Sequence, residues 1–293
     1  MAALVIVPVG AAWLLGPNPS NEAARLRAYL RGVHVHPVSL TGVAPVLREA
    51  VVATEDERFW RNHGIDLVGV ARAAAWDLSH LSLAQGGSTI TEQLVKQLYL
   101  SGNDHSPWRK LEDAVAALRL GLHAPKDGVL QDYLNVVYFG DGAYGVRAAS
   151  RRYFGARPAD LTLPQASMLA GLIQDPFLYD PYTDADAARL RQADVLKSMV
   201  RDGYITIPEG ERALQTPLPL ADGKIVPPLM GVSIAPGQEL SVSLALAGLA
   251  LLCAALLARA VLRRLPIPRV ARLSWLAVAA VGVVVLARSL QFA

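Results

Sequence analysis

The chain has a single cysteine, Cys253, so it offers neither a disulfide framework nor a thiolate metal site. Charged residues are also scarce: they make up 18% of the 293 residues, against 53% hydrophobic residues. That composition is too apolar for a typical soluble globular protein, and the apolar excess gathers at the two ends of the chain. Basic runs interleaved with aromatic residues are missing, which argues against a nucleic-acid partner.

Long uncharged runs near the C-terminus predict membrane helices. Residues 240–258 carry no charge, and a shorter run covers residues 275–287; a membrane-spanning helix needs about 20 such residues. The loop between the runs contains Arg259, Arg263, Arg264, Arg269 and Arg272. The positive-inside rule places this loop in the cytoplasm. We therefore expect two transmembrane helices within residues 240–290, with everything before residue 240 on the outer side.

The first 16 residues, MAALVIVPVGAAWLLG, form another apolar run. It lacks the basic start of a cleaved signal peptide. We expect an N-terminal membrane segment at residues 1–16, either a short tilted span or the remainder of an anchor that begins upstream. Both alternatives deliver the middle of the chain to the outer side. The net charge of +3 says little about that outer part, because five arginines belong to the cytoplasmic loop.

Residues 20–213 are predicted to form one domain, because their apolar residues recur at helical spacing almost throughout. Gly32 and Gly121 lie near the ends of two predicted helices, and Pro107 lies in a first turn, where proline is tolerated. Strand-like alternation is scarce, so the fold class is mainly α. Residues 214–239, rich in proline and glycine, are typical of a linker to the membrane pair.

The stretch EDERFWRNHGID, residues 55–66, places three acidic residues beside Phe59 and Trp60. A solvated helix end would explain such a charge run. Alternatively, Glu55 is partly removed from water, which would raise the pKa of its carboxyl towards the range useful for a general base. The stretch alone leaves both interpretations open.

The stretch GGSTITEQLVKQ, residues 86–97, also has two interpretations. Thr89 and Glu92 have the spacing of a capping box at a helix N-terminus. The same glycine pair, hydroxyls and helix N-terminus offer several donors to an anion. Gln93 and Lys96 share a helix face about one turn further along, which suits phosphate binding.

In WRKLED, two cations precede two carboxylates. Ordinary pairing one turn apart, such as Arg109 with Asp113, explains the pattern and stabilises a helix by about 0.2–0.5 kcal/mol. The alternative is that Arg109 and Lys110 bind a diphosphate. Either Glu112 or Asp113 would then orient the diphosphate or a metal ion.

A fourth stretch, KDGVLQDYLNVVYFG, carries Tyr133 and Asn135 on an apolar helix and is by itself typical of a core. In this order, the four stretches resemble motifs of the peptidoglycan glycosyltransferase family, found in monofunctional transglycosylases and bifunctional penicillin-binding proteins. GAYGVRAASRRYFG, followed by LTLPQASMLAGL, resembles the fifth motif. The resemblance covers roughly residues 40–185, and its long second motif is highly specific.

The resemblance implies a mostly helical, lysozyme-like domain that polymerises lipid II. It implies that Glu55 is the general base, which deprotonates the acceptor hydroxyl as it attacks the donor's anomeric carbon. Asp113 is the implied second catalytic carboxylate, with Glu112 as the alternative. Positions implied to contact the substrate are Asp56, Phe59, Ser88, Thr89, Gln93, Lys96, Arg109, Lys110, Glu112 and Asn135.

The implied partners are lipid II, the growing glycan strand and the membrane; docking of other cell-wall synthesis proteins on the C-terminal hairpin is a further hypothesis. No fixed cofactor is implied, although a divalent cation, Mg²⁺ or Mn²⁺, could accompany the diphosphate. The sequence lacks the Ser-x-x-Lys and Lys-Thr-Gly motifs of a transpeptidase. We therefore expect a monofunctional enzyme of the bacterial cytoplasmic membrane, with its catalytic domain on the periplasmic or extracellular face.

The chain departs from the family pattern at several positions. The departures are Asn62 for His, Asp113 for Glu, Gln131 for Glu, Glu92 for Gln, Gln97 for Asn, and Gln174 where some members have Lys. The changes at Asn62, Asp113 and Gln131 keep open a second interpretation, a family member that binds lipid II or nascent glycan with weak or no turnover. A third, a lysozyme-like enzyme that cleaves glycan, would not need the second motif.

Overall fold

The computed structural model describes residues 21–66, 68–69, 88–99 and 107–235. The chain divides into two compact units, of which the first contains all the described residues except 68–69. The predicted membrane segments at residues 1–16 and 240–290 lie outside the described residues. Within the described ranges, no helix is long and apolar enough to cross a membrane.

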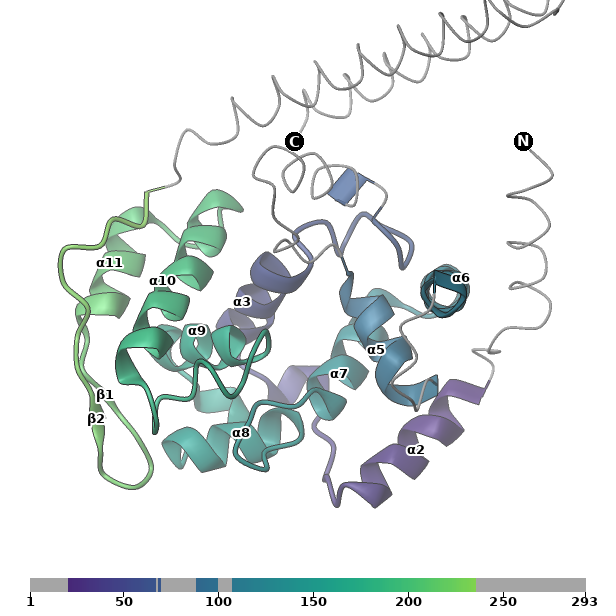
Figure 1. Ribbon diagram of the computed structural model, residues 1–293, viewed down its shortest axis with the longest axis horizontal. Coiled ribbons are helices and arrows are strands. Elements are labelled where there is room, and N and C mark those ends of the chain that lie inside the picture. Colours follow the sequence, from purple (N-terminus) through teal and green to yellow (C-terminus); the bar gives the residue numbers. More distant parts are fainter. Residues whose placement is uncertain (1–20, 67, 70–87, 100–106, 236–293) are drawn as a thin grey trace, which may run out of the picture. The chain divides into compact units, whose positions relative to one another are not determined.

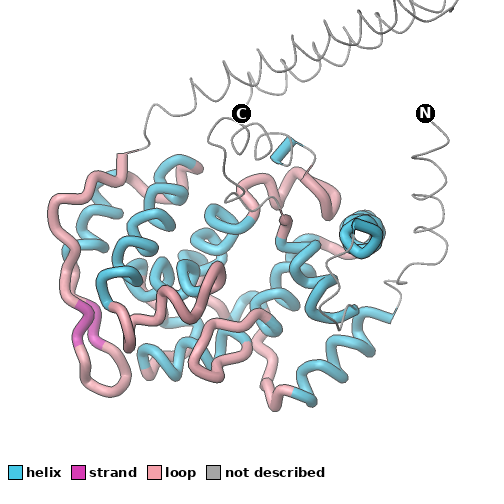
Figure 2. Tube along the Cα trace, viewed as in Figure 1, coloured by secondary structure: helices cyan, strands magenta, loops and turns pink. Residues whose placement is uncertain are grey.

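Helices account for most of the regular structure in the first unit (Figures 1 and 2). The α-helices are α2 (Glu22–Gly32), α3 (Pro45–Glu55), α5 (Ile90–Tyr99), α6 (Pro107–His123), α7 (Lys126–Val136), α8 (Gly145–Phe154), α9 (Leu163–Leu172), α10 (Ala185–Arg201) and α11 (Ile207–Gln215). Short 3-10 turns, η2 (Leu40–Gly42) and η3 (Pro158–Asp160), and one antiparallel hairpin, β1 (Leu218–Pro219) with β2 (Ile225–Val226), are the other regular elements of the described residues. The prediction of a mainly α fold is confirmed.

Helix α9 lies at the centre of this unit. Seven of its ten residues are buried, consistent with a sequence that is apolar on all sides. It packs between α3 and α10, while α5 packs against both α6 and α7. A capping box between Thr162 and Gln165 fixes the start of α9. At the end of α3, Glu55 reaches α5 through a hydrogen bond with Gln93.

Residues 216–235, here called the arm, lie within the segment predicted as a linker and pack onto the domain. Leu218 and Val226 are almost fully buried against one face of the domain. Ile234 is fully buried against Gly210 of α11, where an added Cβ would lie 2.2 Å from the isoleucine side chain. The arm is therefore part of the domain up to residue 235.

A buried arginine fastens the arm. Arg189 of α10 is 1% exposed, and its guanidinium donates to the carbonyl oxygens of Thr216, Val226 and Pro227 at 2.7–2.9 Å. Burial lowers the pKa of Arg189 to about 10, so this side chain remains charged at neutral pH.

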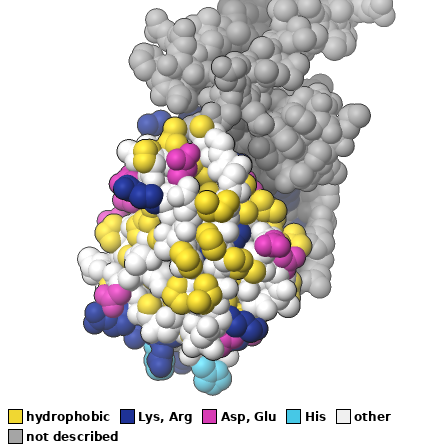
Figure 3. All heavy atoms as spheres, turned by 90° about the vertical axis from the view of Figure 1, so that its left-hand side faces the viewer, with side chains coloured by type: hydrophobic (Ala, Val, Ile, Leu, Met, Phe, Trp, Pro, Cys, Tyr) yellow, Lys and Arg dark blue, Asp and Glu magenta, His cyan; other side chains and the backbone are white. Residues whose placement is uncertain are grey.

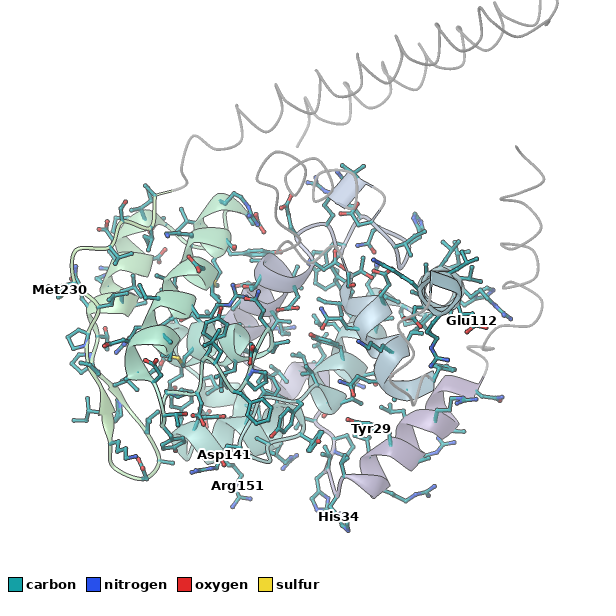
Figure 4. The ribbon with its side chains drawn as sticks, viewed as in Figure 1. Tyr29, His34, Glu112, Asp141, Arg151 and Met230 are labelled. Atoms are coloured by element: carbon teal, nitrogen blue, oxygen red, sulfur yellow. The ribbon has the colours of Figure 1, made fainter. Side chains whose placement is uncertain are left out.

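The outer side of the arm keeps apolar side chains among polar ones, with Met230 at the edge of the domain (Figures 3 and 4).

Candidate functional site

Glu55 is the last residue of α3, a helix whose preceding turns are buried. Its Oε2 accepts a hydrogen bond from Gln93 Nε2 of α5 at 2.8 Å. Burial raises the pKa of Glu55, while the Gln93 hydrogen bond and the charge of Arg191 lower it by less. The side chain nevertheless keeps part of its surface accessible. The structure thus favours a desolvated carboxylate over a solvated helix end for this residue.

Gln93 connects Glu55 to a tyrosine that the sequence indicated only as core. Tyr133 of α7 is fully buried, and its hydroxyl donates to Gln93 Oε1 at 2.8 Å. Burial, followed by the nearby charges of Glu55 and Asp56, holds the pKa of Tyr133 well above its ordinary value. Helices α3, α5 and α7 therefore meet in one hydrogen-bonded chain. The sequence signal that could have indicated this contact was a tyrosine on an apolar helix, because a buried hydroxyl needs a hydrogen-bond partner.

Asp56 is 6% exposed and links two segments to the end of α3. Its Oδ1 accepts from Asn62 Nδ2 at 2.8 Å, and its Oδ2 accepts from the N–H of Ile90, the first residue of α5, at 3.2 Å. A carboxylate at this place satisfies an otherwise free N–H of the helix start. Burial raises the pKa of Asp56 to about 6, although the hydrogen bonds and Lys126 act in the opposite direction.

Asn62, where the family has histidine, bridges Asp56 to a cation. Its Oδ1 accepts from Lys126 Nζ at 2.9 Å. The same ammonium lies 4.4 Å from the centre of the Phe59 ring, and this ring is fully buried. Burial lowers the pKa of Lys126, while Asp56 raises it. The Phe59 ring thus packs against the Lys126 ammonium from the core. The contact of Phe59 with substrate stays a prediction.

We expect Asp56 to make the stability of the domain depend on pH. Its folded-state pKa of about 6 lies above the ordinary 3.8, so the native state binds this proton more tightly than the unfolded state. The free energy of unfolding should therefore fall as pH rises from about 4 to about 6, by up to about 3 kcal/mol. Unfolding of the wild type and Asp56→Asn, compared at pH 4 and pH 7, checks this. Parallel pH profiles for the two proteins would contradict it.

Two glycines let the loop after Asn62 lie directly on α6. Gly64 has a φ of +96°, and an added Cβ would lie 2.0 Å from the carbonyl oxygen of Ala117. Gly121 faces it from α6, where an added Cβ would lie 2.4 Å from the carbonyl carbon of His63. Gly121 therefore serves close backbone packing. This contact connects the segment around Asp56 to the helix that carries the basic third motif.

The capping box predicted at the start of α5 is present. The N–H of Thr89 donates to Glu92 Oε2 at 2.7 Å, and the N–H of Glu92 donates to Thr89 Oγ1 at 3.1 Å. The Thr89 hydroxyl itself donates to the carbonyl of Gly64 at 2.6 Å and is buried. Ser88 is exposed. Of the two hydroxyls predicted to bind the diphosphate, Ser88 is thus the accessible one.

Charged side chains of α5 and α6 form a second group. Arg109 Nη1 lies 3.9 Å from Glu112, and Arg109 Nε lies 3.8 Å from Asp113. Burial raises the pKa of Asp113, and Arg109 and then Lys96 lower it. Lys96 of α5 and Lys110 of α6 are exposed. Glu112 lies on α6 with Lys110 (Figure 4). Both carboxylates contact Arg109, but the positive charge of Lys96 on α5 also acts on Asp113.

The fourth motif holds the segment before α3. Asn135 Oδ1 accepts from the N–H of Val38 at 2.7 Å, and Asn135 Nδ2 donates to the carbonyls of Val38 and Gln131. Gln131 Oε1 accepts from the N–H of Leu40 at 2.9 Å. Because Asn135 is 2% exposed and its amide is engaged, the structure gives it a structural role. Its predicted contact with substrate stays a prediction, and Gln131 supplies an acceptor that a glutamate would also supply.

The motif residues, including Asn62, Lys126 and Tyr133, which the sequence had not assigned to the site, fall into two groups and a structural remainder. The Glu55 group contains Glu55, Asp56, Asn62, Gln93, Lys126 and Tyr133, and the cationic group contains Lys96, Arg109, Lys110, Glu112 and Asp113. Gln97 accepts from Tyr29, and Gln174 is exposed. Within the described ranges, no cluster of three or more His, Cys, Asp or Glu side chains is placed to hold a metal. A reachable base with a raised pKa, held by α5, and exposed cations on α5 and the adjacent α6 together suit transfer from an anionic leaving group.

Residues 22–200 match a protein-family model described as Transglycosylase. Penicillin-binding protein 1A of Neisseria flavescens is 40% identical over 173 residues, which are 59% of this chain and 22% of that protein. Penicillin-binding protein 1A of Aquifex aeolicus is 40% identical over 181 residues, 62% of this chain and 25% of that protein. The chain thus spans about a quarter of the length of these relatives. A crystal structure of penicillin-binding protein 1A from Haemophilus influenzae matches with a TM-score of 0.39 and 24% identity, covering 64% of this chain and 18% of that one.

Proposed function

Because this chain belongs to the transglycosylase family, whose model matches residues 22–200, we propose that it is a peptidoglycan glycosyltransferase that polymerises lipid II into glycan strands. The observation that carries the proposal is the environment of Glu55. Its carboxyl is desolvated enough for a raised pKa, yet it remains partly accessible and is held by Gln93. A general base needs these properties together.

In the proposed reaction, Glu55 accepts the proton of the acceptor sugar hydroxyl. The hydroxyl oxygen forms a bond to the anomeric carbon of the donor while the bond from that carbon to the diphosphate breaks. The lipid diphosphate leaves with the bonding electrons and its added negative charge. Lys96, Arg109 and Lys110 are the cations proposed to stabilise it, and Asp113 is proposed to orient Arg109.

The proposal includes a place for the reaction. The uncharged runs at residues 1–16, 240–258 and 275–287 support anchorage in the bacterial cytoplasmic membrane. The arginines between the two C-terminal runs support an outer location for the domain. Lipid II and the growing strand are the proposed partners there, and a divalent cation could bind the diphosphate oxygens together with the substrate.

The structure bears on the rival interpretation of a family member that binds without turnover. Two of the three departures that suggested it have structural partners: Asn62 bridges Asp56 and Lys126, and Gln131 holds the backbone of Leu40. Asp113 is the departure that remains within the cationic group. The rival therefore rests mainly on whether Asp113 can do the work of a longer carboxylate.

Incubation of the full-length protein in detergent with labelled lipid II tests the proposal. Products are separated by length on a gel, with and without added Mg²⁺ or Mn²⁺. A ladder of polymer supports the glycosyltransferase. Binding of lipid II without polymer would support the rival. Cleavage of preformed glycan without lipid II would contradict both.

Asp113→Glu should leave turnover unchanged or raise it, by up to about tenfold for one improved charged contact. The glutamate side chain is longer by one methylene, as in the family pattern, so its carboxylate can come closer to Arg109. The measurement is the initial rate of polymerisation, with Glu112→Asp as a control that shortens the neighbouring carboxylate. A large loss in Asp113→Glu, together with a large loss in Glu112→Asp, would show that Glu112 acts in place of Asp113.

A further inference from the structure

We propose that Tyr133 is a positioning residue, whose hydroxyl fixes the direction of the Gln93 amide so that Glu55 always faces a hydrogen-bond donor. The inference rests on the proposed function, because it treats Glu55 as the base. It adds a role for a residue that touches neither Glu55 nor the cationic group directly. The role concerns which protonation state of Glu55 the site favours.

The geometry is a chain of two hydrogen bonds with one direction. The Tyr133 hydroxyl donates to Gln93 Oε1 at 2.8 Å, and Gln93 Nε2 donates to Glu55 Oε2 at 2.8 Å. Tyr133 is fully buried, so its hydroxyl is out of contact with bulk water. Among the described residues, Gln93 is the hydrogen-bond partner of that hydroxyl.

A reversed amide would break this arrangement in two places. Gln93 Oε1 would then face the Glu55 carboxylate, a contact that suits only the protonated acid. Gln93 Nε2 would face the Tyr133 oxygen, and the buried phenolic proton would lose its acceptor. The tyrosine hydroxyl therefore selects the amide orientation that stabilises charged Glu55, the form able to accept a proton.

Other charged groups near Glu55 do not replace the amide. Asp56, the next residue, is acidic and cannot favour the charged form of Glu55. Arg191 of α10 does favour it, but its guanidinium is also engaged with the carbonyl of Gly171 and the ring of Tyr179. Without the Tyr133 hydroxyl, the Gln93 amide is free to turn. The pKa of Glu55 should then rise further.

The test is the pH dependence of kcat/KM for polymerisation by the full-length protein in detergent. Tyr133→Phe should move the acidic limb of the profile to higher pH by roughly one unit, the scale of one lost hydrogen bond. Tyr153→Phe is the matched control, because Tyr153 is also fully buried and its hydroxyl donates to the carbonyl of Phe139 at 3.0 Å. The control should leave the limb in place.

A second variant keeps the inference falsifiable. Gln93→Leu removes the amide that Tyr133 orients, so Tyr133→Phe should add no further shift in that background. Additive shifts, or an acidic limb that does not move in Tyr133→Phe, would overturn the inference. Loss of folding in Tyr133→Phe but not in Tyr153→Phe would overturn it too, in favour of a structural role.

A readout without substrate separates this inference from the proposed function. The Glu55 carboxyl can be titrated by carbon-13 NMR of the glutamate-labelled protein and assigned from its absence in Glu55→Gln. An upward pKa shift in Tyr133→Phe supports the inference even if the wild type makes no polymer. An unchanged Glu55 pKa overturns it even if polymerisation is normal.

Discussion

Glu55→Gln should lower the rate of polymerisation by about 10²–10⁴-fold, the contribution typical of a positioned general base. Glutamine keeps the size and shape of the side chain but cannot take a proton. Its amide oxygen can still accept from Gln93 Nε2, which lies 2.8 Å from Glu55 Oε2 in the wild type. Lipid II binding should therefore change little, and the loss should fall on kcat.

The same substitution should leave the fold at least as stable as the wild type. Burial raises the pKa of Glu55, which means that the charged carboxylate is unfavourable at its place in the domain. A neutral amide removes that cost. Thermal unfolding of both proteins at pH 7 checks this point, so that lost activity is not confused with lost structure.

Glu57→Gln is the matched control, since it makes the same chemical change in the same acidic stretch. Glu57 Oε2 lies 3.3 Å from Arg201 Nη2 at the end of α10, so this ion pair is with a cation outside the Glu55 group. Its activity should remain within a few-fold of the wild type, as for a partly exposed ion pair. A Glu55→Gln protein that polymerises at nearly the wild-type rate would show that another group is the base.

The predictable part of this structure depended on signals close together in the sequence. The capping box of Thr89 and Glu92 needs only three residues of spacing, and it is present. The mainly α class followed from helical periodicity, which each helix expresses by itself. The desolvation of Glu55 was one of two open interpretations, because an aromatic one turn away shows apolar surroundings without showing which side is buried.

The contacts between segments far apart in the sequence could not be predicted from local patterns. The hydroxyl of Tyr133 reaches Gln93 across 40 positions of sequence, and no local pattern reports the partner. The sequence showed Asn62 only as a departure from the family's histidine, because its hydrogen bond with Lys126 joins residues far apart in the chain. Asn135 matched a motif position, but a motif gives a residue its place without saying whether its amide faces the substrate or, as here, the backbone of Val38.

Arg189→Met should destabilise the domain by about 3–5 kcal/mol, because each buried acceptor left without its donor costs about 1–3 kcal/mol. Methionine fills a similar volume but donates no hydrogen bond. The carbonyls of Thr216, Val226 and Pro227, all of them in the arm, would lose their guanidinium donor. Gln192 Oε1 would lose the same partner.

Denaturant unfolding of the full-length protein in detergent measures the effect, with Arg147→Met as the control. Arg147 is exposed on α8, where the same substitution should change the free energy of unfolding by no more than about 0.5 kcal/mol. Limited proteolysis adds the location: cleavage should begin within residues 216–235 in Arg189→Met and not in Arg147→Met.

The outcome decides what the arm is. If residues 216–235 were only a connection to a following segment, freeing them would cost little and the remaining domain would unfold at its former denaturant concentration. The buried Leu218, Val226 and Ile234 argue otherwise, because a freed arm would expose them together with the faces of α10 and α11 that they cover. Loss of the Arg189 hydrogen bonds should therefore shift the unfolding of the whole domain.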